Sequence, residues 1–267
     1  MRIVVQDTMG NYTRFILLKV GMHCKSRAAP ARCFIRRRFR TPAYWTLDCI
    51  VRRDELRIPL LVRLYHRYLG DQQPAPFMMR VTSSYRTATL ARIAKQGDRE
   101  SRRASIMALS LLGGYEDRLV FSNALWDTDR GVRMLADDGI REIWARAGNA
   151  EQQHCLRAIK RMNEGADFSG AARAASDLCL SAPGFAEAWN QKAIAEFFAG
   201  EVTDSIQSCS QALLINPQHY EAAVGLGHAF LEVDEPQLAI ESFGQALELN
   251  PHLDAIRAYV AKVQRTL

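Results

Sequence analysis

The chain has 267 residues, of which 48% are hydrophobic and 24% charged, which is typical of a globular protein with one or two domains. Its net charge of +6 is unevenly distributed, because residues 1–70 hold 15 Lys/Arg and 4 Asp/Glu whereas the remainder holds 20 and 25. No apolar run approaches the roughly 20 residues of a membrane helix. The six cysteines lack the close pairing of a disulfide framework or a zinc site. We therefore expect a basic segment, a mildly acidic body and reduced, cytoplasmic thiols.

Residues 1–53 carry most of the positive charge. The apolar runs Ile3–Val5 and Phe15–Leu18 fit short strands or a weak signal-like core, but no clean cleavage site follows. The cluster Arg36–Arg40 is compatible with contact to nucleic acid or to an acidic membrane surface, because phosphate attracts such charge. The alternative, which we favour, is a solvated tail. We predict that residues 1–53 form a basic, poorly ordered arm.

Helical spacing of apolar residues begins after the arm. A first helix is predicted over residues 54–70, and Asp71–Pro76 has the composition of a turn-rich linker. Residues 82–148 are predicted to be helical throughout. They contain a faint internal repeat, in which the stretch that begins at Arg102 aligns with the stretch that begins at Arg133.

The string Asp-Thr-Asp-Arg-Gly-Val-Arg at residues 127–133 lies between helical segments. It resembles the helix-to-helix corner of HEAT repeats, of the short type found in bilin-lyase-like proteins. The resemblance implies HEAT-like helical repeats over residues 54–150. Asp127 or Asp129 can cap the next helix, and Arg133 is predicted to reach a neighbouring carboxylate such as Asp98.

The same region offers candidate metal ligands in Asp127, Asp129, Asp137 and Asp138. Their spacing lacks the glycine and the terminal glutamate of a calcium loop. We predict no metal site and no cofactor.

Residues 152–253 repeat with a period of 34, in the units 152–185, 186–219 and 220–253. Each unit has two blocks of helical spacing, a short polar break between them, and a proline at its thirty-second position. A period of this length predicts a solenoid of helix pairs. Small residues at the eighth and twentieth positions, such as Gly227 and Ala239, let the paired helices approach closely.

The polar breaks contain signals for helix ends. Gly165 and Gly200 are suited to the left-handed conformation that ends a first helix. Asp167 and Asp234 can cap the second helix, and Pro236 is tolerated in its first turn.

These units resemble tetratricopeptide repeats. The residues that match the family pattern are Trp189, Ala193, Ala212, Pro217, Leu226, Gly227, Phe230, Ala239, Phe243, Ala246 and Pro251. The first unit departs from the pattern, with Cys155 where Trp is usual. The resemblance implies an all-α superhelix, in which the HEAT-like segment and residues 151–267 form one α-α solenoid that ends in a capping helix at residues 254–267.

In this family the first helices line a concave groove that binds a protein or peptide. The groove positions carry over to Leu156, Lys160, Asn163, Glu187, Asn190, Ile194, Phe197, Phe198, Glu221, Val224, His228 and Leu231. Ile194, Phe197 and Phe198 form an i, i+3, i+4 patch that suits a partner helix or an extended peptide, although such a stripe is also typical of core packing. Some family members hold a terminal carboxylate with basic and Asn side chains, and only Lys160 fits that arrangement.

No catalytic motif is present: we find no G-x-S-x-G, no H-E-x-x-H, no phosphate-binding loop and no Rossmann fingerprint. His23–Cys24 lacks an orienting partner nearby in sequence. The sequence therefore predicts a non-catalytic, cytoplasmic scaffold that binds a protein or peptide through its concave face. Two alternatives stay open. One is a bilin-lyase-like chaperone or modifying factor, and the other is attachment of the basic arm to nucleic acid or to an acidic membrane.

Overall fold

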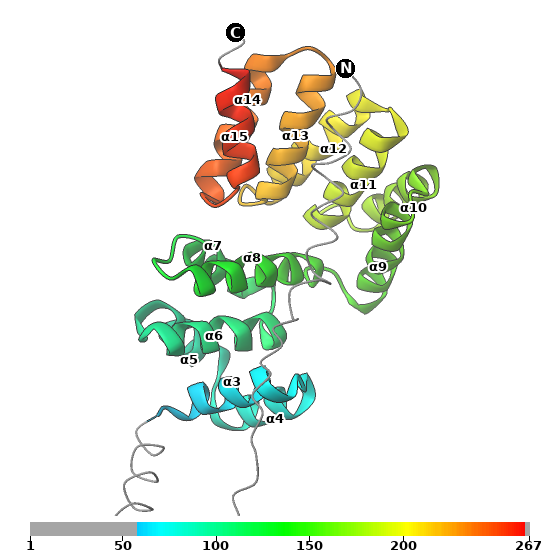
Figure 1. Ribbon diagram of the computed structural model, residues 1–267. Helices are drawn as coiled ribbons and strands as arrows, with labels where there is room; N and C mark the ends of the chain where they lie inside the picture. Colours follow the sequence, from blue (N-terminus) through cyan, green and yellow to red (C-terminus); the bar gives the residue numbers. More distant parts are fainter. Residues whose placement is uncertain (1–57, 265–267) are drawn as a thin grey trace, which may run out of the picture. The chain divides into compact units, whose positions relative to one another are not determined.

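Thirteen α-helices and one short 3-10 helix make up the part of the chain that the structure describes, residues 58–264 of a computed structural model (Figure 1). The predicted basic arm, residues 1–53, lies outside these residues, as do positions 54–57 of the first predicted helix and residues 265–267 of the capping helix. From Pro59 onward the described residues belong to a single unit by their contacts. None of the described helices has the length and apolar character needed to cross a membrane.

The first two helices are α3 (Leu60–Asp71) and α4 (Pro74–Ser84). Only Gln72 and Gln73 separate them, so the predicted linker over Asp71–Pro76 is wrong. Pro74 and Pro76 lie in the first turn of α4, where a missing N–H costs no hydrogen bond. Gln72, with φ of 54°, makes the left-handed turn that ends α3.

The next helices follow in the order α5 (Thr87–Gln96), α6 (Arg99–Leu112), η1 (Tyr115–Asp117), α7 (Arg118–Ala124) and α8 (Arg130–Ala145). Helix α6 packs against both α5 and α8. The starts of α6 and α8 are equivalent positions of the faint repeat, as the alignment predicts. An aspartate caps each of them by accepting a backbone N–H of the first turn: Asp98 accepts that of Ser101, and Asp129 that of Val132.

The last seven helices are α9 (Ala150–Glu164), α10 (Phe168–Ser181), α11 (Ala186–Ala199), α12 (Val202–Ile215), α13 (Tyr220–Glu232), α14 (Pro236–Leu249) and α15 (Asp254–Val263). The second helices α10, α12 and α14 begin at the same position of each predicted repeat. Neighbours in sequence pack as pairs, and no strand occurs between residues 58 and 264. The fold is an all-α solenoid with tetratricopeptide-like repeats, as predicted.

The turns inside the three repeats share one backbone conformation. Ala166, Gly200 and Asp234 have φ of 60°, 85° and 60°, and they occupy the same position in successive repeats. The prediction for Gly200 is confirmed, but Gly165 has φ of −84° and the left-handed residue is the alanine after it. Asp167 caps α10 as predicted, at 3.0 Å from the N–H of Gly170. Asp234 does not cap α14, because it is itself the left-handed residue.

Two hydrophobic cores hold the helices together. One cluster joins buried side chains of α3–α8, including Phe121 and Trp144, to those of α13–α15, including Tyr220 and Phe243. A second, smaller cluster belongs to α9–α11 and the turns beside them. The larger core therefore crosses the boundary between the HEAT-like and tetratricopeptide segments that the sequence analysis proposes near residue 150.

The close crossing of α13 and α14 gives a stability prediction. A Cβ atom on Gly227 would lie 2.5 Å from Cε1 of Phe243, whereas one on Gly244 would have no neighbour within 4 Å. Gly227→Ala is expected to lower the free energy of unfolding by about 1–3 kcal/mol through overpacking. The matched control Gly244→Ala is expected to raise it by about 0.5–1 kcal/mol, because glycine weakens a helix interior. Urea unfolding followed by circular dichroism measures both, and a gain of stability in both variants would contradict the close crossing.

Candidate interaction surface

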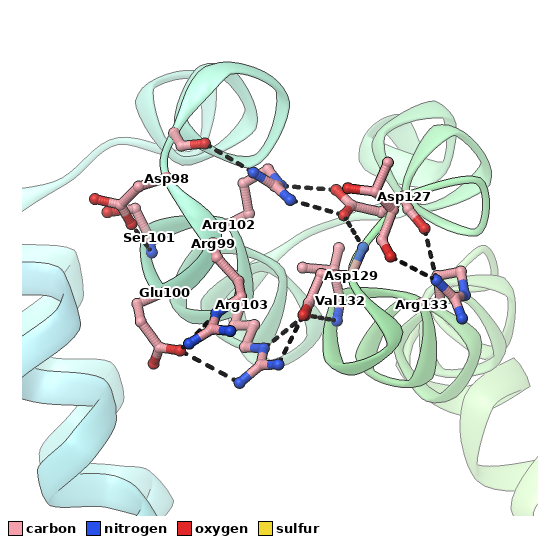
Figure 2. Close-up of polar contacts among 12 residues, drawn as sticks. Asp98, Arg99, Glu100, Ser101, Arg102, Arg103, Asp127, Asp129, Val132 and Arg133 are labelled. Carbon is pink, nitrogen blue, oxygen red and sulfur yellow. Dashed lines mark hydrogen bonds and ion pairs between the residues drawn. The ribbon is translucent and has the colours of Figure 1, made fainter.

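Two arginine–aspartate ion pairs connect the predicted corner between α7 and α8 to helix α6 (Figure 2). Arg102, on α6, donates to both carboxylate oxygens of Asp127, at 2.7 and 2.8 Å. Arg103 binds Asp129 in the same bidentate way, with N–O distances of 2.6 and 2.8 Å. Such paired contacts are the strongest form of charge-assisted hydrogen bond in proteins.

The corner differs from the prediction in its partners. Arg133 does not reach Asp98 but donates to the backbone carbonyls of Asp127 and Thr128, at 2.9 and 3.0 Å (Figure 2). The carboxylates of Asp127 and Asp129 are hydrogen-bonded to the guanidinium groups of Arg102 and Arg103. Residues 58–264 contain no group of three candidate metal ligands. The corner fastens α6 to α8 and offers no free ligand.

A second polar cluster lies on the inner face of the repeats, around the buried carboxylate of Glu187 on α11. The ammonium of Lys160 lies 2.7 Å from one oxygen, and Nε2 of His219 lies 2.9 Å from the other. Nδ1 of His219 accepts the backbone N–H of Ala222, so the ring proton is on Nε2 and is donated to Glu187. Burial alone would raise the pKa of Glu187. The positive charge of Lys160 and the hydrogen bond from His219 have the larger effect, so the pKa of this carboxyl lies below its usual range.

Helix α8 joins this cluster from the preceding segment. Trp144 stacks on the His219 ring, with centroids 4.0 Å apart. Arg141 lies 3.2 Å from the Tyr220 hydroxyl and 3.1 Å from the Glu221 carboxylate. Asp137 accepts hydrogen bonds from the Tyr220 hydroxyl at 2.6 Å and from the Asn250 amide at 2.9 Å. The beginning of α13 is therefore covered by the protein's own α8.

This packing removes part of the predicted groove. Leu156, Glu187 and Asn190 are buried, so they are not available as contact surface in this structure. Lys160 is paired with Glu187, Glu221 with Arg141, and Asn163 donates to the backbone and side chain of Gln191. Lys160, Asn163 and Glu221 are therefore engaged by other residues of this chain.

The other six predicted positions are half-buried. They are Ile194, Phe197, Phe198, Val224, His228 and Leu231. Burial against Phe243, whose ring centre lies 5.1 Å away, lowers the pKa of His228 to about 4, which keeps its ring neutral.

An aromatic cluster stands out among the half-buried positions. The rings of Phe198 and Phe168 are stacked with centroids 5.0 Å apart, and Phe197 meets Phe198 edge-on at 5.4 Å. The position that the family usually gives to an aromatic residue holds Glu196, which is buried and accepts a 2.6 Å hydrogen bond from Ser208. We call Phe168, Phe197, Phe198 and Ile194 the aromatic patch. Phe168 was missed because it belongs to a second helix, and the alignment of first helices gave no signal for it.

No protein-family model and no curated protein matches the sequence. Among solved structures, the "MamA RS-1 ArsTM double mutant" is similar at 17% identity and a TM-score of 0.37, over 74% of this chain and 98% of that one. Residues 41 to the end of MamA from Desulfovibrio magneticus RS-1 are similar at 17% identity and a TM-score of 0.36, over 73% and 98%.

The corner predicts a pH dependence of stability. The hydrogen bonds from Arg103, against the opposing effect of burial, lower the pKa of Asp129 to about 2. A carboxyl whose pKa falls on folding stabilises the fold at neutral pH, and this contribution is lost as the pH falls from about 5 towards 2. Asp129→Asn keeps a good cap but loses the ion pair, so the free energy of unfolding at pH 7 should drop by on the order of 1–3 kcal/mol.

Unfolding curves for the wild type and Asp129→Asn should converge as the pH approaches 2. The matched control is Asp254→Asn, because the Asp254 side chain is 85% exposed and its loss should have little effect at any pH. A difference between wild type and Asp129→Asn that stays constant from pH 7 to pH 2 would contradict the assignment.

The Glu187 cluster predicts that removal of one cation, Lys160, lowers the free energy of unfolding more than Asp129→Asn does. Lys160→Met leaves the buried carboxylate without its cation, and breaking a buried pair in this way costs about 3–5 kcal/mol. Arg157→Met, on the exposed side of the same helix, is the control and should change stability by less than about 0.5 kcal/mol. Adding Glu187→Gln should restore part of the loss. Equal stability of the Lys160 and Arg157 variants in thermal unfolding would show that Lys160 has no such role.

Proposed function

We propose that the protein is a non-catalytic repeat scaffold that binds a protein or peptide through the open part of its inner face. The observation that carries the proposal is the aromatic patch, in which Ile194, Phe197 and Phe198 occupy i, i+3 and i+4 of one helix and remain half-buried. This spacing matches the anchors by which helices and extended peptides are recognised. Aromatic side chains of this kind contribute most to binding energy when a partner covers them fully.

The inner face is divided into two parts with different roles. Its beginning, around Glu187 and Glu221, is taken up by Lys160, His219 and Arg141. The aromatic patch lies in the later part of α11 and at the start of α10. A partner therefore has access to the apolar part of the face, and the ionic part stabilises the fold.

The patch is also ordered before a partner arrives. Stacking of Phe168 on Phe198, with Phe197 edge-on, restricts all three rings. A surface with restricted side chains loses less entropy on binding, which strengthens the complex that it forms.

Two of the three described cysteines are unsuited to thiol chemistry. Cys155, Cys179 and Cys209 are free. Burial raises the pKa of Cys179 and of Cys209 to about 12, so both are protonated at neutral pH and unsuited to nucleophilic attack. Free thiols of this kind fit a cytoplasmic scaffold, which is the compartment that we propose.

The test is quantitative affinity capture with the wild type and the double variant Phe197→Ala/Phe198→Ala. We expect the partner to be lost by the double variant, because both anchors are removed. The control is Leu180→Ala/Leu214→Ala, which deletes two leucines with 82% and 75% exposure on the second helices α10 and α12. Circular dichroism must show equal helicity for all three proteins. Retention of every partner by the phenylalanine variant, or equal loss in both variants, would contradict the proposal.

A further inference from the structure

The charge of the repeats indicates what kind of partner fits the aromatic patch. Residues 193–256 contain ten Asp/Glu and no Lys or Arg. Three of these acids are paired with basic side chains: Glu196 with Lys192, Glu221 with Arg141 and Asp254 with Arg257. The other seven are exposed and have no ion pair with any residue between 58 and 264. Within the part of the chain that the structure describes, residues 193–256 therefore carry seven carboxylates that no basic side chain neutralises.

Part of that charge follows the edge where the turns inside the repeats lie. The N-caps of α10, α12 and α14 are Asp167, Glu201 and Glu235, so an acidic residue recurs at this position in every repeat. Since the same left-handed turn precedes each of them, the three side chains recur in equivalent places along one edge of the stack, where α9 joins α10, α11 joins α12 and α13 joins α14 (Figure 1).

The aromatic patch lies at this same edge. Phe168 is the first residue of α10 and directly follows Asp167. Phe198 is in the last turn of α11, shortly before Glu201. The two rings are stacked on each other, so carboxylates from two successive turns flank one aromatic surface.

The basic residues near this edge are few. Arg161, in the last turn of α9, is exposed, and Glu164 follows it on the same turn. With Asp167, Glu201 and Asp204 also exposed, these four carboxylates outnumber the guanidinium groups of Arg161 and of Arg173, which is exposed on α10. Among the described residues, the formal charge at this edge is therefore negative.

We propose that the partner segment is a basic amphipathic peptide, whose apolar side chains cover Phe197 and Phe198 and whose Lys or Arg side chains lie against Asp167 and Glu201. The inference rests on the proposed function and specifies the partner's chemistry. Complementary charge speeds association and rejects wrong partners, while the apolar anchors supply affinity. A cation next to the stacked phenylalanines also gains cation–π attraction. Acidic peptides and nucleic acid carry the wrong charge for this edge.

The test is fluorescence anisotropy of the full chain with three labelled peptides of one apolar pattern. The first carries Leu and Phe anchors with Lys between them, the second has Glu at every Lys position, and the third has Gln there. We expect the Lys peptide to bind at least about tenfold more tightly than the Gln peptide at low salt, and to lose affinity as salt rises.

Variants then assign the binding to the patch. Phe197→Ala/Phe198→Ala should remove binding of the Lys peptide, and Glu201→Gln should weaken it several-fold without changing the Gln peptide. Glu248→Gln removes an exposed carboxylate on α14 and is the matched control, with no expected effect.

Each remaining outcome overturns a defined claim. If the Gln peptide binds as tightly as the Lys peptide and both depend on the phenylalanines, the charge inference is wrong and the proposed function stands. If the Lys peptide binds independently of the phenylalanines, it reports only diffuse attraction, and the inference is wrong. If the Lys peptide does not bind at all, the inference is likewise overturned, while affinity capture decides the proposed function separately.

Discussion

A carboxylate that leaves water needs a positive charge and hydrogen-bond donors, and Glu187 finds both inside the chain. Lys160 comes from the preceding repeat and His219 from the turn before the next one, so the interaction joins three successive first helices. Trp144 covers the same histidine and brings α8 onto the repeats. This buried group thereby ties the first helices together, and its contacts take up part of the predicted groove.

Periodicity in the sequence predicts most of the fold, because a repeated helix pair must bury the same face each time. The period of the three units predicts the starts of the second helices, and the fainter repeat before them gives α6 and α8 equivalent starts. The cap at Asp129 is one of the two predicted candidates, whereas Asp98 was expected to pair with Arg133 and caps α6 instead. Local sequence rules fail where a residue is compatible with two backbone conformations. Prolines 74 and 76 fit a turn and also a first helical turn, and the left-handed turn residue falls on Ala166 although Gly165 is adjacent.

The candidate site is less predictable, because it depends on contacts between residues far apart in the chain. The positions carried over from the family are residues of first helices, and the carry-over assumes that solvent or a ligand faces them. The partners Asp137 and Arg141 belong to a helix that lies far before α13 in the chain, and no spacing rule links them to the groups that they hold there. Arg102 and Arg103 were missed for the same reason, since their acids belong to a different helix pair.

The two kinds of charged cluster in this protein have opposite consequences for recognition. At the corner and around Glu187, every carboxylate has a cation within hydrogen-bonding distance, so these groups contribute to folding and present little net field. At the edge of the repeats, the acidic caps recur without such partners among the described residues, and they flank stacked phenylalanine rings that no helix covers completely. A surface with uncompensated charge beside half-buried aromatic area gains from a partner that supplies both cations and apolar side chains, and an internal ion pair gains nothing from one.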